Sequence, residues 1–386
     1  MQGRQESSSL TLFEYCESQQ AGLRRAIETL VRLESPSTDK AAVDRCGAAV
    51  SAMFQSIGAQ VTTIPQPARG NHVRADLAGG ARRVLLLGHF DTVWDVGRLE
   101  SMPLREEGGR LHGPGVYDMK ASIAVSALAL RALRDLKYES PRVVALWTTD
   151  EEIGSGTSRA IIEAEARACD AVLVLEPSLP GGAAKTHRKG CGEFTLAVHG
   201  VSAHAGIDPR KGVSAIHELV HQIRVIQELQ DLDRGISLNV GTIEGGTRGN
   251  VVAEWASAVI DVRVPTMADA ARVEAAFRGL APGNPAARLE LHGGVGRPPL
   301  ERTSAVARLY EQARSVAATM GRGLAEGGTG GGSDGNFTAA LGVPTLDGLG
   351  PDGDGAHAQH EHVLLADLPW RAAFLAGLLH RLNLVE

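Results

Sequence analysis

Three short apolar runs in the first half of the chain constrain its fold more than any other feature. They are VLLLG at 84–88, VVALW at 143–147 and AVLVL at 171–175. Short runs that are apolar at every position are typical of strands buried on both faces of a sheet. The alanine-rich segments 118–133 and 157–166 lie between these strands and predict helices. The first half is therefore predicted to be an α/β sheet flanked by helices.

The pattern changes after residue 184, and residues 192–199 alternate as a half-exposed strand does. The segments that follow predict helices at 213–229 and 269–280, strands on either side of Asn250, and a strand at 288–292. The resulting order β-α-β-β-α-β is that of a ferredoxin-like α+β unit, with one sheet covered by two helices.

Helical patterns like those of the first half return at 304–320 and 369–382, so the α+β unit interrupts a larger domain. A chain of 386 residues exceeds the size at which one hydrophobic core usually stops growing. We expect a larger domain formed by 1–189 and 302–386, with 190–301 inserted between its two parts.

Charge and hydropathy exclude several kinds of partner. The formal net charge is -6, so no basic field attracts nucleic acid or an anionic membrane. No run of eighteen apolar residues predicts a membrane span, and the polar residues 1–9 do not begin a secretion signal. These features predict a cytoplasmic protein without nucleic acid or membrane partners.

The cysteines indicate neither a disulfide framework nor a thiolate metal site. Four cysteines are present, they lie far apart, and no C-x-x-C pair occurs. A bound metal would therefore need His, Asp and Glu ligands.

The first apolar run ends in Gly88-His89-Phe90-Asp91, which places His89 and Asp91 on the same side of an extended segment. Sites in α/β sheets form at the carboxyl ends of the strands. Asp91 could accept the ring N–H of His89 and hold the ring as a metal ligand. The alternative is a strand-end histidine followed by a turn aspartate, and this fragment alone leaves both open.

Two further acidic segments follow the same edge. Asp118 ends a Gly-rich turn where a helical pattern begins, so it could cap that helix or bridge two cations with its two oxygens. The run 143–147 leads into Asp150-Glu151-Glu152, where three consecutive acids repel one another unless cations offset the charge. A solvated acidic loop is the alternative, although such a loop seldom follows directly from a buried strand.

The third apolar run ends in Glu176-Pro177, and a late segment, GAHAQHE at 355–361, adds imidazoles. Together these segments offer two imidazoles and three carboxylates: His89, Asp118, Glu152, Glu176 and His357. Two zinc ions about 3.5–4 Å apart need a ligand set of this kind. Glu151 then remains as a base.

Five motifs occur in order: an H-x-D strand end, a G-x-x-D turn, a D-E-E-x-G strand end, an E-P strand end and a late G-x-H-x-x-x-E. In this order they resemble, over nearly the whole chain, the aminoacylase and glutamate carboxypeptidase family of dinuclear zinc metallopeptidases. The glutamate carboxypeptidase branch is the most similar. The resemblance implies a zinc-peptidase-like mixed sheet flanked by helices, with an inserted dimerisation or lid domain.

The resemblance also implies two Zn²⁺ per chain, for which Co²⁺ or Mn²⁺ could substitute. His89 and Glu176 would hold one ion, Glu152 and His357 the other, and Asp118 would bridge them. Glu151 would act as general base, and Asp91 would support His89. His360 and His362 are rivals of His357, which is preferred because its spacing to Glu361 matches the motif. The Asp118–Met119 peptide bond would be cis.

In the inserted domain, GVSAHAG at 200–206 resembles the lid turn of the same family. The resemblance implies a homodimer formed through this domain, in which His204 reaches the partner's site and stabilises the tetrahedral oxyanion. The alternative for His204 is a surface-loop histidine.

Asn250, Arg263 and Arg297 have counterparts in the glutamate carboxypeptidase branch, and a guanidinium matches a carboxylate in two-point contact. An arginine on a strand could instead be solvated or salt-bridged. The turn GGGSD at 330–334 lacks a P-loop lysine, so Gly331 and Gly332 are assigned to substrate recognition by backbone amides. Lys185 lies nearest a lysine of the branch, but its spacing is offset and its substrate contact stays undecided.

These assignments predict hydrolysis of the amide bond of an N-acyl or peptidyl amino acid with a free carboxylate, with a C-terminal glutamate or a similar acidic residue as the leaving part. A small-acyl deacylase of the same fold would share every metal ligand. A zinc-binding protein without activity is a more remote alternative, which the intact Glu151 and ligand set oppose. The acyl group, the preferred C-terminal residue and the metal used in the cell are not determined by the sequence.

Overall fold

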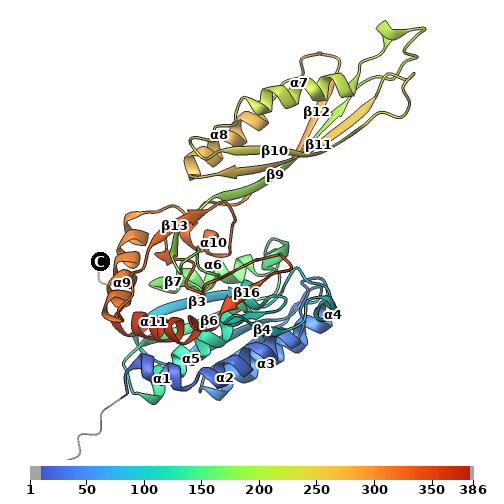
Figure 1. Cartoon of the computed structure of the whole chain (residues 1–386). Helices are drawn as coiled ribbons and strands as arrows, with labels where there is room; N and C mark the ends of the chain where they lie inside the picture. Colours follow the sequence, from blue (N-terminus) through green and yellow to red (C-terminus); the bar gives the residue numbers. More distant parts are fainter. Residues whose placement is uncertain (1–9, 383–386) are drawn as a thin grey trace, which may run out of the picture. The chain divides into compact units, whose positions relative to one another are not determined.

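The computed structural model describes residues 10–382, and within these the chain divides into two compact units (Figure 1). The first unit contains the residues up to Thr186, 302–328 and those from Ser333 onward. The inserted unit contains His187–Glu301 and Thr329–Gly332.

The first unit is built around a six-stranded sheet with the order β1-β2-β6-β3-β7-β14. In this order the strands are Gln60–Ile64, His72–Leu77, Pro141–Thr148, Gly80–His89, Ala171–Val174 and Thr345–Leu346. β3 runs parallel to β6 and β7, and β7 runs parallel to β14, whereas β2 is antiparallel to β1 and β6. The sheet is therefore mixed, as predicted.

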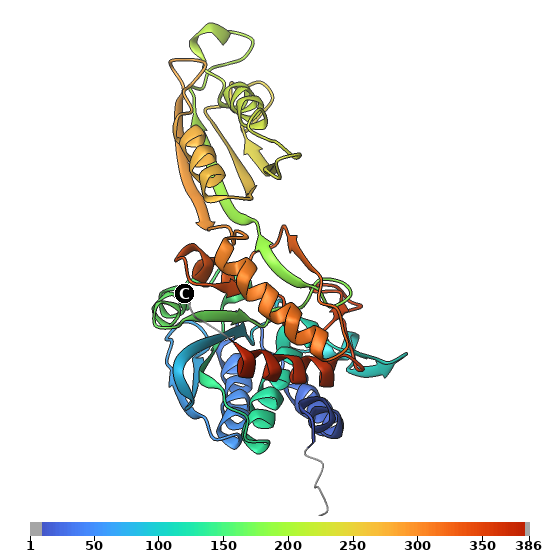
Figure 2. The same ribbon diagram turned by 90° about the vertical axis from the view of Figure 1, so that its left-hand side faces the viewer.

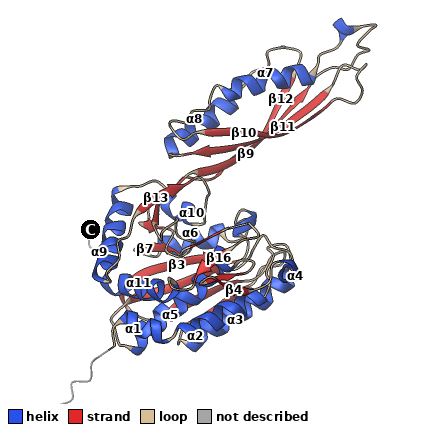
Figure 3. Ribbon diagram, viewed as in Figure 1, coloured by secondary structure: helices blue, strands red, loops and turns tan. Residues whose placement is uncertain are grey.

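Helices cover both faces of this sheet (Figure 3). Val84 and Leu86 of β3 point into a core shared with four helices: α3 (Lys40–Ser56), α5 (Ala121–Asp135), α9 (Ser304–Thr319) and α11 (Leu368–Arg381). Leu85 and Leu87 point into the core on the opposite face, with α6 (Arg159–Arg167) and α10 (Gly335–Ala340). The alternation explains why these strands are apolar at every position.

Shorter elements complete the first unit. α1 (Leu12–Ser18) and α2 (Gln20–Arg32) pack against α5, and α9 and α11 lie side by side (Figure 2). A second sheet has the order β15-β16-β5-β4, with strands Gly353–Asp354, His362–Leu364, Arg110–His112 and Arg105–Glu107. α4 (Arg98–Ser101) precedes it, and β8 (Ala184–Arg188) pairs with β13 (Glu326–Thr329).

The inserted unit is a four-stranded antiparallel sheet with the order β10-β11-β9-β12. These strands are Ser237–Gly245, Trp255–Val264, Gly190–His199 and Arg288–Arg297. The helices α7 (Ala215–Gln227) and α8 (Met267–Arg278) lie on the same face of the sheet (Figure 1) and share a core with its buried side chains. The predicted order β-α-β-β-α-β and the predicted fold class are confirmed.

One predicted helix begins later than expected. α5 starts at Ala121 instead of 118, because residues 116–120 form a turn in which Asp118 has φ -114° and ψ 92°. The N-cap of α5 is Lys120, and no side chain caps it, so Asp118 is not a helix cap. The Asp118–Met119 peptide bond is cis, as the resemblance implied.

Between residues 10 and 382, every helix is too short or too polar to cross a membrane. The prediction that 1–9 is not a secretion signal concerns residues outside the described part.

Candidate metal centre and substrate-binding residues

The residues predicted as metal ligands lie together at one edge of the large sheet. β6, β3 and β7 are parallel neighbours, so their carboxyl ends meet at that edge. His89 ends β3, Glu152 follows β6, and Glu176 follows β7. Asp118 lies in the turn before α5, and His357 lies in the loop between β15 and β16.

The two oxygens of Asp118 face two different histidines. Its Oδ1 lies 3.2 Å from His89 Nε2, which is also 3.5 Å from Glu176 Oε1. Its Oδ2 lies 3.5 Å from His357 Nε2, which is 3.0 Å from Glu152 Oε2. The five side chains thus form two sets of one imidazole and one carboxylate, with Asp118 between them.

Charge is concentrated in this cluster. Burial alone would lower the pKa of His89, but its contacts with Asp118, Asp91 and Glu176 raise that pKa well above the ordinary value. Contacts with Asp118 and Glu152 raise the pKa of His357 to about 10. Burial raises the pKa of Glu152, whereas the two histidines hold the pKa of Asp118 well below its usual range against the effect of burial. The raised pKa values of the two histidines show that each imidazole faces negative charge.

The donor set fits two divalent cations. Ligand atoms of His89, Asp118 and Glu152 already lie within 4.8 Å of one another. Imidazole nitrogen and carboxylate oxygen are ordinary zinc ligands, and a carboxylate with two oxygens can bridge two ions. A divalent cation bound at each pair of imidazole and carboxylate would offset the negative charge there.

Asp91 contacts the His89 ring chiefly through its backbone. His89 Nδ1 lies 3.0 Å from the Asp91 carbonyl oxygen and 3.4 Å from its Oδ1. The carboxylate also accepts hydrogen bonds from Ser37 Oγ, at 2.7 Å, and from the Glu152 backbone, at 3.3 Å. These contacts leave His89 Nε2 directed at the acidic side chains.

The rivals of His357 have other surroundings. The His360 ring lies 3.6 Å from Asp354 on the surface. The His362 ring packs against His112 with centroids 5.1 Å apart, and its Nδ1 faces the His360 carbonyl oxygen. His357 differs from both, because its ring contacts the predicted ligands Asp118 and Glu152.

Glu151 lies at the start of the short turn after β6, next to Glu152, and is partly buried. The buried carboxylate of Asp334 binds the chain on both sides of these two acids. It accepts hydrogen bonds from Thr148 Oγ1, at 3.1 Å, and from Ser155 Oγ. Asp334 had no assigned role in the sequence, and only the GGGSD motif could have drawn attention to it.

Glu361 is a second residue whose role the motif alone did not reveal. Its buried carboxylate accepts hydrogen bonds from the backbone N–H groups of Gly115, Tyr117 and Asp118 and from Trp94 Nε1. Burial raises the pKa of Glu361 to about 7. The sequence feature that pointed to Glu361 was its position four residues after His357 in the motif.

In the inserted unit, His204 and Asn250 are brought together and are exposed. The Ala205 N–H donates to the Asn250 carbonyl oxygen at 3.0 Å, and His204 pairs with Val251. His204 Nδ1 accepts hydrogen bonds from the N–H groups of Gly206 and Ile207, at 3.1 and 3.2 Å. The neutral ring therefore carries its proton on Nε2, which can donate outward.

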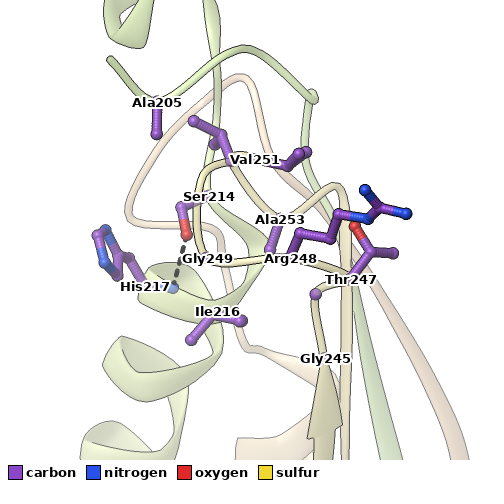
Figure 4. A pocket seen from close by; sticks show the side chains of 12 residues that line it. Ala205, Ser214, Ile216, His217, Gly245, Thr247, Arg248, Gly249, Val251 and Ala253 are labelled. Carbon is purple, nitrogen blue, oxygen red and sulfur yellow. Dashed lines mark hydrogen bonds between the residues drawn. The ribbon is translucent and has the colours of Figure 1, made fainter.

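A cavity of about 500 Å³ lies beside this pair (Figure 4). Ala205, Gly249 and Val251, the chain neighbours of His204 and Asn250, line it together with Arg248 and His217. In Figure 4 the 245–249 loop faces the start of α7, where Ser214 Oγ accepts a hydrogen bond from the His217 backbone at 3.3 Å. The inserted unit thus has a recess where the lid turn was predicted.

The other predicted substrate residues gather at the opposite end of the inserted sheet. Arg263 and Arg297 both pair with Cys191, one on each neighbouring strand. The Arg263 guanidinium binds Asp261 at 2.8 and 2.9 Å and Cys191 Sγ at 2.6 Å. A Cβ added to Gly332 would lie 2.6 Å from Arg297 Cδ, so Arg297 passes closely over that glycine.

A buried arginine fixes the Gly-rich turn. Arg188 Nη1 donates hydrogen bonds to the carbonyl oxygens of Gly331 and Gly332, at 3.2 and 3.1 Å. Lys185 lies in the first unit, where its backbone N–H donates to the Asp347 carbonyl oxygen at 2.8 Å. Arg188 was not predicted, although it follows Lys185 by only three positions.

Comparison with known proteins places the chain in a family. The model of peptidase family M20/M25/M40 matches residues 85–381. The chain belongs to this family of hydrolytic enzymes, and the predicted resemblance to the aminoacylase and glutamate carboxypeptidase group is confirmed.

Particular relatives lie in more than one branch. The chain is 28% identical to carboxypeptidase G2 of Pseudomonas sp. (strain RS-16) over 377 residues, which cover 95% of this chain and 91% of that protein. It is 30% identical to acetylornithine deacetylase of Shigella sonnei (strain Ss046) over 262 residues, covering 62% of this chain and 67% of that protein. The structure of aminopeptidase PepT from Bacillus cereus ATCC 10987 has a TM-score of 0.77 at 21% identity, covering 94% of this chain and 98% of that one.

Proposed function

We propose that this chain is a dinuclear zinc carboxypeptidase that hydrolyses the amide bond preceding a C-terminal amino acid with a free carboxylate, glutamate or a similar acidic residue. The observation that supports this most strongly is the position of Asp118, whose two oxygens face two separate pairs of imidazole and carboxylate. A single ion would leave one of those pairs uncompensated.

In this proposal His89 and Glu176 hold one ion, Glu152 and His357 hold the other, and Asp118 lies between them. Zinc bound there would polarise the amide carbonyl and lower the pKa of water. The contact of Asp91 with His89 Nδ1 keeps Nε2 directed at the metal position.

Glu151 is the proposed proton carrier. It adjoins the ligand Glu152 in the turn after β6 and is not itself in either pair. Its carboxylate would take a proton from the attacking water and pass that proton to the departing amine, so that one residue serves as base and then as acid.

The proposed carboxylate contacts come from Arg297, Arg263 and the turn at Gly331 and Gly332. Backbone N–H groups of the turn can donate to a carboxylate, and a guanidinium binds one in two-point geometry. Arg263 binds Asp261 at two points, whereas Arg297 passes closely over Gly332 of the turn. We therefore assign the principal contact to Arg297 and a supporting role to Arg263.

A homodimer is proposed because the inserted unit holds two groups of predicted substrate residues far from each other. Arg297 pairs with Cys191, near the start of β9, whereas His204 lies beyond His199 at its end. Positions 191 to 199 alone span about 26 Å at about 3.3 Å per residue. One small substrate cannot bridge that length, so we propose that His204 and Asn250 act on the substrate bound by the other chain.

The surface of the inserted unit supports the same proposal. β10 is an edge strand with mostly exposed side chains, among them Ile243 at 55% exposure. Ile216 and Val220 are exposed on neighbouring turns of α7. An edge strand beside exposed aliphatic side chains favours pairing with another chain, and a second copy is the proposed partner.

A second candidate function is removal of a small acyl group from an amino acid. The 30% identity to acetylornithine deacetylase favours it, and the metal ligands would be the same. Only the substrate-binding residues separate the two candidates.

A substrate panel on protein of measured zinc content tests the proposal. Benzoyl- and pteroyl-glutamate should be hydrolysed with higher kcat/KM than N-acetylornithine and other N-acetyl amino acids. Benzoyl-glutamate with its α-carboxylate converted to an amide should be a poor substrate, because the contact with Arg297 is lost. Preference for the N-acetyl substrates would favour the deacylase, and equal turnover of acid and amide would contradict the carboxylate assignment.

A further inference from the structure

The carboxylate of Glu361 connects two parts of the candidate metal centre that are distant in sequence. Glu361 lies on the same loop as His357, four residues later, and the residue is only 1% exposed. The groups that it binds belong to the turn of Asp118 and to the loop after His89. Each of these segments supplies or adjoins a predicted ligand.

Both oxygens of Glu361 are fully used. Oε1 accepts the N–H groups of Tyr117, at 2.9 Å, and Asp118, at 3.0 Å. Oε2 accepts the N–H of Gly115, at 2.9 Å, and Trp94 Nε1, at 2.8 Å. Four donors converging on one buried carboxylate fix its position and theirs, since a buried N–H without a partner is costly.

These hydrogen bonds constrain the backbone of Asp118 directly. One of the four donors is the backbone N–H of Asp118 itself, and two others belong to the three residues before it. One helical hydrogen bond, from the Lys120 N–H to the Gly115 carbonyl oxygen at 3.0 Å, spans the turn. At Asp118 the backbone is not helical, with φ -114° and ψ 92°, and its N–H donates to Glu361 instead. The direction of the Asp118 side chain therefore depends on the hydrogen bonds that Glu361 accepts.

We propose that Glu361 is a positioning residue that holds Asp118 with one oxygen toward each imidazole, and that this contact allows two metal ions to bind instead of one. The proposal rests on the dinuclear site proposed above. Without Glu361, Asp118 would be free to turn both oxygens toward one ion, and the other ion would keep only one imidazole and one carboxylate.

The substitution Glu361→Gln tests this with little change in shape. A glutamine offers one acceptor oxygen, and its NH₂ group would meet two N–H donors. We expect zinc titration of the metal-free protein to give two tight ions in the wild type. In Glu361→Gln one ion should remain tight and the second should bind roughly 10–100-fold more weakly, the usual effect of changing a residue behind a metal ligand.

Glu218→Gln is the matched control. The buried Glu218 carboxylate also accepts two backbone N–H groups, from Gly283 at 2.8 Å and Asn284 at 2.9 Å, but it lies in the inserted unit. The variant Glu218→Gln should lower the Tm of the metal-free protein without changing the affinity for either zinc ion. Glu361→Asp, which keeps the charge on a shorter side chain, provides the test if Glu361→Gln does not fold.

The outcomes separate this proposal from the function on which it rests. Wild-type protein with two zinc ions, together with Glu361 variants that lose affinity for only one, supports the positioning role. Unchanged affinity for both ions in a folded Glu361 variant, even with a lowered Tm, overturns it and leaves the dinuclear site standing. A wild type that binds no second ion overturns both.

Discussion

At the scale of single residues, the candidate centre depends on acids whose environments differ although they are neighbours in sequence. Glu152 is held against His357 at 3.0 Å, and its side chain is 6% exposed. Glu151, one position earlier, belongs to neither pair of ligands. In the proposal Glu152 is therefore a metal ligand, and the adjacent Glu151 is the proton carrier.

This difference predicts the behaviour of Glu151→Ala. The variant should keep two zinc ions per chain and lose turnover by about 10²–10⁴-fold or more, because it removes the proton carrier and no ligand. Metal analysis and kcat on the same preparation measure both effects. Glu152→Ala is the matched control and should lose zinc together with activity. Loss of zinc from Glu151→Ala would mean that the two roles are exchanged.

The sequence predicted the residues that end buried strands better than those that support them. His89 and Glu176 could be found because an apolar run that ends in a polar residue marks the edge of a sheet. Asp334 and Glu361 could not be assigned their contacts, since their partners lie far along the chain. The choice of His357 over His362 required the family motif, because spacing within GAHAQHEH does not show which ring contacts Asp118 and Glu152.

At the scale of elements, the Gly-rich turn and the strand that ends at Arg297 form one substrate-binding feature in the proposal. A Cβ on Gly332 would lie 2.6 Å from Arg297 Cδ and 3.1 Å from Cys191 Sγ. The atom nearest to such a Cβ belongs to the flexible side chain of Arg297. The protein can therefore fold with an alanine at position 332 if the Arg297 side chain moves. The absence of a side chain at Gly332 thus sets where the Arg297 guanidinium lies.

Gly332→Ala should therefore raise KM for benzoyl-glutamate by roughly tenfold, the loss expected for one hydrogen-bonded charge contact, with a smaller change in kcat. Gly331→Ala is the control, because a Cβ there meets only Thr329 Oγ1, at 3.9 Å. Steady-state kinetics and Tm on both variants distinguish displacement of Arg297 from general damage. Equal KM values for the two variants would argue against an Arg297 contact with substrate.

Periodicity predicted the long elements and missed the short ones. The order of strands and helices in the inserted unit followed from alternation and helical spacing, because each element is long enough to bury one face. The sheet formed by β15, β16, β5 and β4 was not predicted, since its strands have two or three residues and show no period. The late start of α5 was missed for a different reason: residues 116–120 are as compatible with a helix as those that follow.

At the scale of the whole molecule, the proposed enzyme needs two chains for one complete site. The first unit holds the proposed metal ligands and Glu151, and the lid turn with His204 would come from the partner. This requirement makes activity a property of the dimer and allows two inactive variants to restore each other.

The test combines Glu151→Ala with His204→Ala under conditions of subunit exchange. His204→Ala alone should lower turnover by about 10²–10³-fold with unchanged zinc content, as removal of one oxyanion donor does. A mixed dimer would have one intact site, made of Glu151 in one chain and His204 in the other, so an equal mixture should regain about a quarter of wild-type activity.

Mass spectrometry of the intact dimers shows whether mixed dimers form. A mixture of Glu151→Ala with Glu151→Ala,His204→Ala is the control and should stay inactive, because no chain retains the base. Mixed dimers that form and remain inactive would contradict action of His204 across the interface.

The inserted unit separates His357 from the other proposed ligands along the chain. This separation affects when the metal centre can form during synthesis. Four of the five proposed ligands precede residue 177, and His357 follows the whole inserted unit. At about 5–20 residues per second, synthesis of the intervening chain takes roughly ten seconds or longer. During that time three acids and one imidazole exist without the second imidazole and without Glu361. We expect the nascent chain to acquire its full metal complement only at the end of translation, after the inserted unit has left the ribosome.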